Sequence, residues 1–441
     1  MNVLLSLLQK STDYNQLLKA VEAKQAVAVS GLSQAPRSHV LAAVHEQSGR
    51  PLIAVCQDDM AAKRLASELG AFLGEEPPVL PSRELTLAGA IGVSRQVLVA
   101  SLDALLLRTI PRQTLFSASV TLRVGAEYSM PDLISRLTRA GYSRASLVEG
   151  VGQFALRGGI LDVYSPAQEK PLRAEFFGDE LDTMGYFDPI TQRRTENADE
   201  AILLPVAETE PHLHPQGVAG LCGDLRAIIT RQQRRKTPNQ ALIETLQKDC
   251  EALENETLFA SADRYMALIY PEFTTAASYL PQEAVVAFCD HGNLQRGEKD
   301  RAEEFGLLLD SFLTAGTLFG ELCDYYATID DLAASLQGRA VIYCDGFLAA
   351  RYPESLPPKQ LLSFTARQLP GYGGSLETAA ADLKNYASNQ YGSIVLCGGQ
   401  RRGEILKDLL AKSGLNALLA FPLTKLPQPG QILIAGASRR A

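Results

Sequence analysis

A strand, a turn and a helix follow one another in Ala26-Val-Ala-Val-Ser-Gly31-Leu-Ser-Gln-Ala-Pro36-Arg37-Ser38. The apolar first half predicts a buried strand, and Gly31 marks the turn. Pro36 suits the first turn of the helix, because proline lacks an N–H that would have no partner there. The same alternation recurs at the apolar runs 52–55 and 97–100. Strands that alternate with helices predict a mostly parallel sheet.

The turn in this segment has the spacing of a phosphate-binding loop, G-x-x-x-x-G-K-[ST], with Gly31 and Ser38 at its two ends. Pro36 replaces the second glycine and Arg37 replaces the lysine. Such a loop binds phosphate through its N–H groups, and proline removes one of them. Arginine is also wider and planar, whereas lysine is a compact charge. We therefore predict a strand–turn–helix unit that does not bind a nucleotide.

A second candidate nucleotide site follows the apolar run 285–289. An NTPase motor would have Asp-Glu at this strand end, where the aspartate holds Mg²⁺ and the glutamate orients water. Asp290 fits this pattern, but His291 replaces the glutamate. Asp-His after a strand is also what a solvated strand end would show. Taken with the altered loop, it predicts a motor-like fold that has lost its ATP chemistry.

The overall composition limits the classes of function. The chain has 441 residues, enough for two to four domains, and its net charge of −8 argues against a general nucleic-acid binder. Its seven cysteines form no C-x-x-C pair, and His212 and His214 have no cluster of ligands around them, so we expect no metal site. The N-terminus does not resemble a signal peptide, and no apolar run reaches membrane-spanning length, which predicts a cytoplasmic protein.

The pattern changes character along the chain. From about residue 120, apolar and polar residues alternate with period two between frequent glycines, which predicts a small α+β insertion dominated by antiparallel strands. After about residue 205 the pattern predicts helices over 220–280 and a strand at 285–288. The predicted organisation is a motor-like α/β domain in two parts, an insertion between them, and a separate small α/β domain at the end: 1–119 and 206–345, 120–205, and 346–441.

Strand alternation singles out one face of the insertion. Leu172 and Phe176 share the apolar side of one predicted strand, so Arg173 and Phe177 lie on the opposite side. The same argument places Arg157 outward on the preceding strand. An exposed aromatic residue beside an arginine is typical of a protein-binding hot spot. A Phe177 covered by a loop of its own domain, with the arginine stacked on it, is the alternative interpretation.

Two neighbours complete this prediction. Gly178-Asp179 fits a tight hairpin turn that would hold the Phe177 end of the strand rigidly. Glu175 lies between Arg173 and Phe177 on the same face, and we expect it to hold Arg173 in place.

These segments resemble the transcription-repair coupling factor family and its relative UvrB. The similarity is most specific in 145–205, which includes the run Gly152-Gln-Phe-Ala-Leu-Arg157-Gly-Gly-Ile-Leu-Asp162. It implies a degenerate helicase-like domain that is split by a UvrA-binding insertion and followed by a variable domain. It also implies that UvrA is bound through Arg157, Arg173 and Phe177.

The two families differ in features that this sequence can test. UvrB would retain an intact phosphate loop and an aromatic-rich hairpin that grips DNA, whereas 81–92 contains no aromatic residue. The resemblance therefore implies a non-catalytic module without a cofactor. It would recruit UvrA to lesion-stalled transcription complexes in nucleotide excision repair and bind DNA weakly or not at all. A UvrB-like, ATP-dependent DNA-damage helicase is the alternative.

The family resemblance also concerns parts beyond this chain. The motor and the RNA-polymerase-binding domain of the family lie further toward the C-terminus, and a C-terminal domain masks the UvrA-binding surface in the full-length factor. We therefore expect an N-terminal fragment or a natural short form, and the sequence does not distinguish the two.

Overall fold

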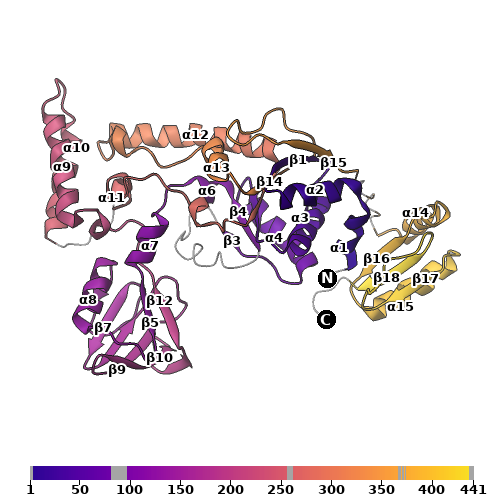
Figure 1. Cartoon of the computed structure of the whole chain (residues 1–441), viewed down its shortest axis with the longest axis horizontal. Coiled ribbons are helices and arrows are strands. Elements are labelled where there is room, and N and C mark those ends of the chain that lie inside the picture. Colours follow the sequence, from indigo (N-terminus) through magenta and orange to yellow (C-terminus); the bar gives the residue numbers. More distant parts are fainter. Residues whose placement is uncertain are drawn as a thin grey trace.

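The computed structural model describes residues 3–80, 97–255, 262–365, 369, 372 and 374–436. It is a mixed α/β structure with a large parallel sheet, a mainly antiparallel insertion and a separate small sheet, as the sequence predicts. In Figure 1 the parallel sheet lies near the centre, the insertion lies at the lower left, and the small C-terminal unit lies at the right.

The parallel sheet has seven strands in the order β15-β1-β14-β13-β2-β4-β3. Its inner strands are apolar and almost entirely buried, as expected for a sheet with helices on both faces. The strands are β1 (Ala26–Ser30), β2 (Leu52–Cys56), β3 (Val79–Leu80), β4 (Val97–Ser101), β13 (Val285–Cys289), β14 (Ala340–Cys344) and β15 (Gln360–Ser363).

Helices cover both faces of this sheet. Alternate residues of β1 enter two different cores, with Val27 and Val29 on one side and Ala26 and Ala28 on the other. The first core is closed by α1 (Val3–Ser6), α2 (Thr12–Glu22), α3 (Gln34–Ser48) and α4 (Asp59–Leu73). The second is closed by α6 (Leu102–Leu106), α12 (His291–Thr314), α13 (Ile329–Ser335) and the 3-10 helix η4 (Ala276–Tyr279).

The insertion folds around its own core. Its six-stranded sheet has the order β11-β10-β9-β8-β7-β6 and is antiparallel except for the pair β6–β7. A two-stranded sheet and α8 (Met130–Arg139) complete the unit. The strands are β5 (Val120–Arg123), β6 (Ser143–Arg144), β7 (Gln153–Arg157), β8 (Ile160–Val163), β9 (Leu172–Phe177), β10 (Glu180–Phe187), β11 (Arg194–Asn197) and β12 (Glu200–Leu203).

A helical region connects the insertion to the second half of the parallel sheet. The long helices α9 (Gly217–Gln233) and α10 (Gln240–Glu254) form a hairpin that stands at the left of Figure 1. Their shared core also receives residues from α7 (Arg112–Ala118) and α11 (Met266–Ile269). The remaining short 3-10 helices are η1 (Leu7–Lys10), η2 (Pro211–Leu213), η3 (Ala262–Tyr265) and η5 (Gly320–Leu322).

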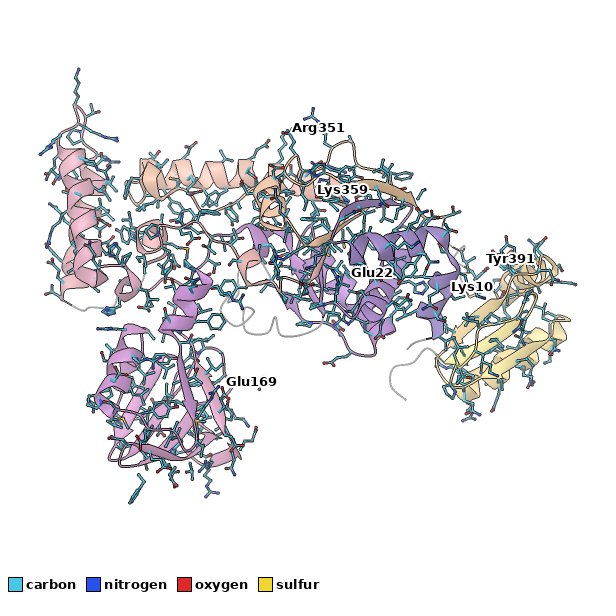
Figure 2. All side chains as sticks on the ribbon, in the orientation of Figure 1. Lys10, Glu22, Glu169, Arg351, Lys359 and Tyr391 are labelled. Atoms are coloured by element: carbon cyan, nitrogen blue, oxygen red, sulfur yellow. The ribbon has the colours of Figure 1, made fainter. Side chains whose placement is uncertain are left out.

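The C-terminal unit is a small parallel sheet in the order β16-β18-β17, with its own apolar core. It consists of α14 (Leu376–Ser388), β16 (Ser393–Cys397), α15 (Gln400–Lys412), β17 (Ala417–Ala420) and β18 (Ile432–Gly436). Although we expected the last domain to begin at residue 346, β15 pairs in parallel with β1 and therefore belongs to the large sheet. In Figure 2, Arg351 and Lys359 lie in the segment between β14 and β15, and Tyr391 lies in the small unit.

None of the helices in the described part of the chain combines the length and the apolar character needed to cross a bilayer.

Candidate protein-binding face

Phe177 lies at the exposed end of β9. Its side chain is 85% exposed, while Leu172 and Ala174 on the other side of the strand are fully buried, as strand alternation predicts. The turn Gly178-Asp179 connects β9 directly to β10, and Gly178 has a positive φ of 68°, which suits the first residue of a type II′ turn. The aromatic ring is thus held out from a short, well-defined hairpin.

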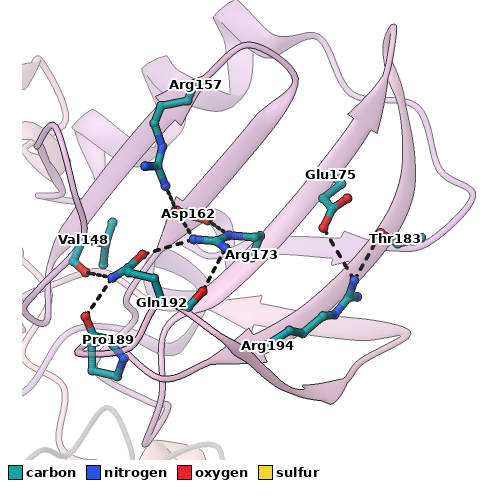
Figure 3. Close-up of polar contacts among 9 residues, drawn as sticks. All are labelled: Val148, Arg157, Asp162, Arg173, Glu175, Thr183, Pro189, Gln192 and Arg194. Carbon is teal, nitrogen blue, oxygen red and sulfur yellow. Dashed lines mark hydrogen bonds and ion pairs between the residues drawn. The ribbon is translucent and has the colours of Figure 1, made fainter.

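Asp162 joins the two predicted arginines on this face. Nη2 of Arg157 lies 2.7 Å from Oδ2 of Asp162, and Arg173 donates to both carboxylate oxygens, from Nε at 2.7 Å and from Nη2 at 2.9 Å. The Asp162 side chain is 1% exposed, whereas Arg157 is 50% exposed and Arg173 is 18% exposed. Figure 3 shows the three side chains converging from β7, β8 and β9. One carboxylate for two guanidinium groups leaves a net positive charge.

Arg173 is fixed by further contacts. It donates to the backbone oxygen of Gln192 and to Oε1 of its side chain, both at 3.2 Å, and its guanidinium carbon lies 4.5 Å from the centre of the Phe187 ring. The hydrogen bonds to Asp162 raise the pKa of Arg173 above its usual value. Arg173 therefore lies on the outward face, as predicted, but its contacts cover most of the side chain.

The prediction that Glu175 holds Arg173 is wrong. Oε1 of Glu175 instead lies 3.6 Å from Nη1 of Arg194 on β11, and the carboxylate that pairs with Arg173 belongs to Asp162. The sequence contained a signal for this arrangement. A two-residue turn between β7 and β8 pairs Arg157 with Ile160, which puts Asp162 on the same face, directly opposite Arg173 on β9.

Comparisons with known proteins cover the part of the chain that contains this face. Residues 120–208 match the family model of the UvrB interaction domain. The transcription-repair-coupling factor of Myxococcus xanthus is 34% identical over 44% of this chain and 18% of its own length. Those of Staphylococcus aureus (strain USA300) and Bacillus subtilis are 23% and 21% identical over 94% and 97% of this chain.

The chain matches the N-terminal region of the transcription-repair coupling factors. It spans less than two-fifths of the length of the Staphylococcus aureus and Bacillus subtilis relatives, 37% and 38% respectively. Coupling of transcription to DNA repair is the process to which these relatives belong by name.

The turn that begins at Gly31 is occupied by contacts within the protein. The N–H groups of Gly31 and Leu32 donate to the carbonyls of Gly346 and Asp345. Gly31 has a φ of 80°, and a Cβ atom there would lie 2.0 Å from the carbonyl oxygen of Phe364. The loop therefore packs against the segments that follow β14 and β15.

The rest of the loop lies in the first turns of α3. Pro36 occupies the third position of this helix, where it supplies no N–H. Arg37 is half-buried, and its Nε has no hydrogen-bond partner among the residues that the structure describes. Ser38 is fully buried, and its hydroxyl donates to the carboxylate of Glu68 on α4. This serine, which would hold Mg²⁺ in a working loop, is thus engaged within the protein.

The two residues that follow β13 also make contacts within the protein. Asp290 has a left-handed backbone conformation at the start of α12, and its carboxylate accepts from the side chain of Asn293. His291 is fully buried against the rings of Phe288, Tyr343 and Tyr352. Neither ring nitrogen of His291 has a hydrogen-bond partner within the described residues, and burial lowers its pKa from 6.5 to about 4.

Two other predictions concern regions or groups outside this face. The aromatic-free stretch 81–92 lies outside the described residues. In the part of the chain that the structure describes, no three His, Cys, Asp or Glu side chains gather so that they could hold a metal ion.

Proposed function

We propose that this chain is a recruitment module that binds UvrA through the outward face of its insertion. The observation that carries the proposal is Phe177, 85% exposed on a short hairpin, on the same face of the sheet as two arginines that share one buried carboxylate. The match of residues 120–208 to the UvrB interaction domain supports a protein-binding role for the same unit. In this proposal the module acts in nucleotide excision repair in the bacterial cytoplasm.

The energetics of the face suit a protein partner. Burying the Phe177 ring at an interface would contribute about 1.5–3 kcal/mol from its apolar area. Arg173 is already held by hydrogen bonds to Asp162 and Gln192, so binding requires little additional ordering of its side chain. Arg157 is half exposed and retains N–H groups for a carboxylate of the partner. We therefore expect the partner surface to combine a non-polar depression with acidic side chains.

We also propose that recruitment by this chain needs no ATP and no cofactor. The support is the loop at Gly31, where two backbone N–H groups are used internally, and the buried hydroxyl of Ser38. Pro36 and Arg37 remove two features on which phosphate binding depends. This proposal places the ATP-driven motor and the contact with RNA polymerase in other parts of the full-length factor, and it disfavours a UvrB-like helicase.

The direct test is capture of purified UvrA by the full 441-residue chain, with and without ATP and Mg²⁺. The proposal predicts that UvrA forms a complex with this chain when no ATP is present. Treating this chain alone with ATP and Mg²⁺, and removing the free nucleotide before UvrA is added, should leave the affinity unchanged. Absence of a complex at micromolar concentrations of both proteins would contradict it.

A further inference from the structure

A second prominent apolar side chain lies on the loop between β10 and β11. Ile190 is 90% exposed. Among the large apolar side chains that the structure describes, the three most exposed are Phe347, Ile190 and Phe177. Phe177 ends β9, and the loop of Ile190 connects β10 and β11 of the same six-stranded sheet. Single exposed apolar residues are common on protein surfaces, so the argument depends on where Ile190 is placed and how firmly.

The loop that carries Ile190 has a fixed shape. One carboxylate oxygen of Asp188 accepts from the N–H of Ile190 at 3.0 Å and from both the N–H and the hydroxyl of Thr191 at 2.7 and 3.0 Å. The backbone of Asp188 also donates to Arg193 and accepts from Gln192. This is an aspartate-capped turn, and a rigid loop loses little conformational freedom when its apolar tip is buried by a partner.

Gln192 connects this loop to the paired arginines. Its Oε1 accepts from Arg173, and its Nε2 donates at 2.7 Å to the carbonyl of Pro189, the residue immediately before Ile190. The backbone of Gln192 takes the left-handed conformation, with a φ of 59°, and its carbonyl also accepts from Arg173. Figure 3 shows Gln192 between Pro189 and the guanidinium of Arg173. The loop and Arg173 therefore form one unit on the outward face.

We propose that Ile190 is a further contact residue for UvrA, an inference that rests on the proposed function. Phe177 and Arg173 lie four residues apart on one side of β9, about 13 Å along the strand, and the Ile190 loop is attached at the Arg173 end. The docking surface therefore has an apolar contact beyond each end of its charged centre. It fits a partner with two non-polar patches separated by acidic groups.

The test is Ile190→Ser in the full chain, with UvrA affinity measured by isothermal titration calorimetry. The expected result is a loss of about tenfold with an unchanged melting temperature, because an exposed side chain contributes little to the fold. Leu307→Ser is the matched control, since Leu307 is a 74% exposed aliphatic residue on α12 and should leave the affinity unchanged. Asp188→Ala, which loosens the loop but keeps Ile190, should cause a smaller loss than Ile190→Ser.

The outcomes separate this inference from the proposed function. If Phe177→Ala weakens UvrA binding tenfold while Ile190→Ser stays within twofold of the unaltered chain, the Ile190 inference fails and the proposed function stands. If the unaltered chain does not bind UvrA, both fail. If Ile190→Ser disrupts self-association of this chain in sedimentation experiments but leaves UvrA binding intact, the loop is an interface between copies and the inference is overturned.

Discussion

Arg157 and Arg173 lie on different strands, yet both donate from Nη2 to the same oxygen of Asp162, at 2.7 and 2.9 Å. Arg157 is half exposed, whereas Arg173 is mostly covered because it also contacts Gln192 and Phe187. The shared carboxylate fixes the spacing of the two guanidinium groups. The positive centre of the face thus depends on a residue that a partner cannot reach.

Asp162→Asn should weaken both the fold and UvrA binding. The substitution leaves two guanidinium groups without their buried counter-charge, at a cost of about 1–3 kcal/mol in the free energy of unfolding. Differential scanning fluorimetry should show a melting transition lowered by about 4 °C or more. Glu196→Gln is the control, because Glu196 is an exposed acid of the same sheet that pairs with exposed Lys170. Equal melting of the two variants would show that Asp162 does not organise this face.

Arg157→Ala and Arg173→Ala should separate binding from stability. Arg157 has one ion pair and is half exposed, so its loss should lower UvrA affinity about tenfold with little change in melting. Arg173→Ala should lower the affinity and also the melting temperature, because it removes contacts with Asp162, Gln192 and Phe187. Identical melting of the two variants, measured in parallel, would be inconsistent with the different exposure of the two arginines.

The chain should not bind or hydrolyse ATP. Equilibrium dialysis with labelled ATP and Mg²⁺ should show no saturable binding at micromolar concentrations, because the loop N–H groups of Gly31 and Leu32 are already used. The paired change Pro36→Gly with Arg37→Lys should not restore binding, since Ser38 remains engaged with Glu68 and His291 remains in place of a glutamate. Saturable binding by the unaltered chain that is lost in Arg37→Ala would favour the UvrB-like alternative.

His291 should make the domain that contains the parallel sheet less stable in mild acid. Its pKa is lowered from 6.5 to about 4 in the folded protein, so the unfolded chain takes up the proton first. The stability that depends on a neutral His291 is fully present above about pH 6.5. It is lost as the pH falls toward 4, which lowers the free energy of unfolding by up to about 3 kcal/mol.

His291→Phe keeps a ring among Phe288, Tyr343 and Tyr352 but removes the titrating group. The melting temperature of this variant minus that of the unaltered chain should therefore increase as the pH is lowered from 7 to 5. Glu210, whose pKa burial raises to about 7, titrates in both proteins and cancels in the difference. A difference that does not depend on pH would contradict the account.

Local patterns in the sequence were sufficient for most of the fold. Apolar runs predicted four of the seven strands of the parallel sheet, namely β1, β2, β4 and β13, but not β3, β14 or β15. Alternation predicted which side of β9 is exposed. Both kinds of prediction depend only on neighbouring residues. The partner of Arg173 was not predicted, because it depends on which strand pairs with which and in what register. Gln192 is a still harder case. It reaches Arg173 from a loop nineteen positions away, and it needs a left-handed backbone that glutamine seldom adopts.

The most direct test of UvrA recruitment is the dissociation constant of the UvrA complex for Phe177→Ala, measured alongside its melting temperature. Phe347→Ala is the matched control, because Phe347 is a 92% exposed phenylalanine outside the insertion. We predict that Phe177→Ala lowers the affinity at least about tenfold with unchanged melting, and that Phe347→Ala changes neither. Unchanged UvrA affinity in Phe177→Ala, or a drop in its melting temperature of the size that a core phenylalanine would cause, would contradict the account.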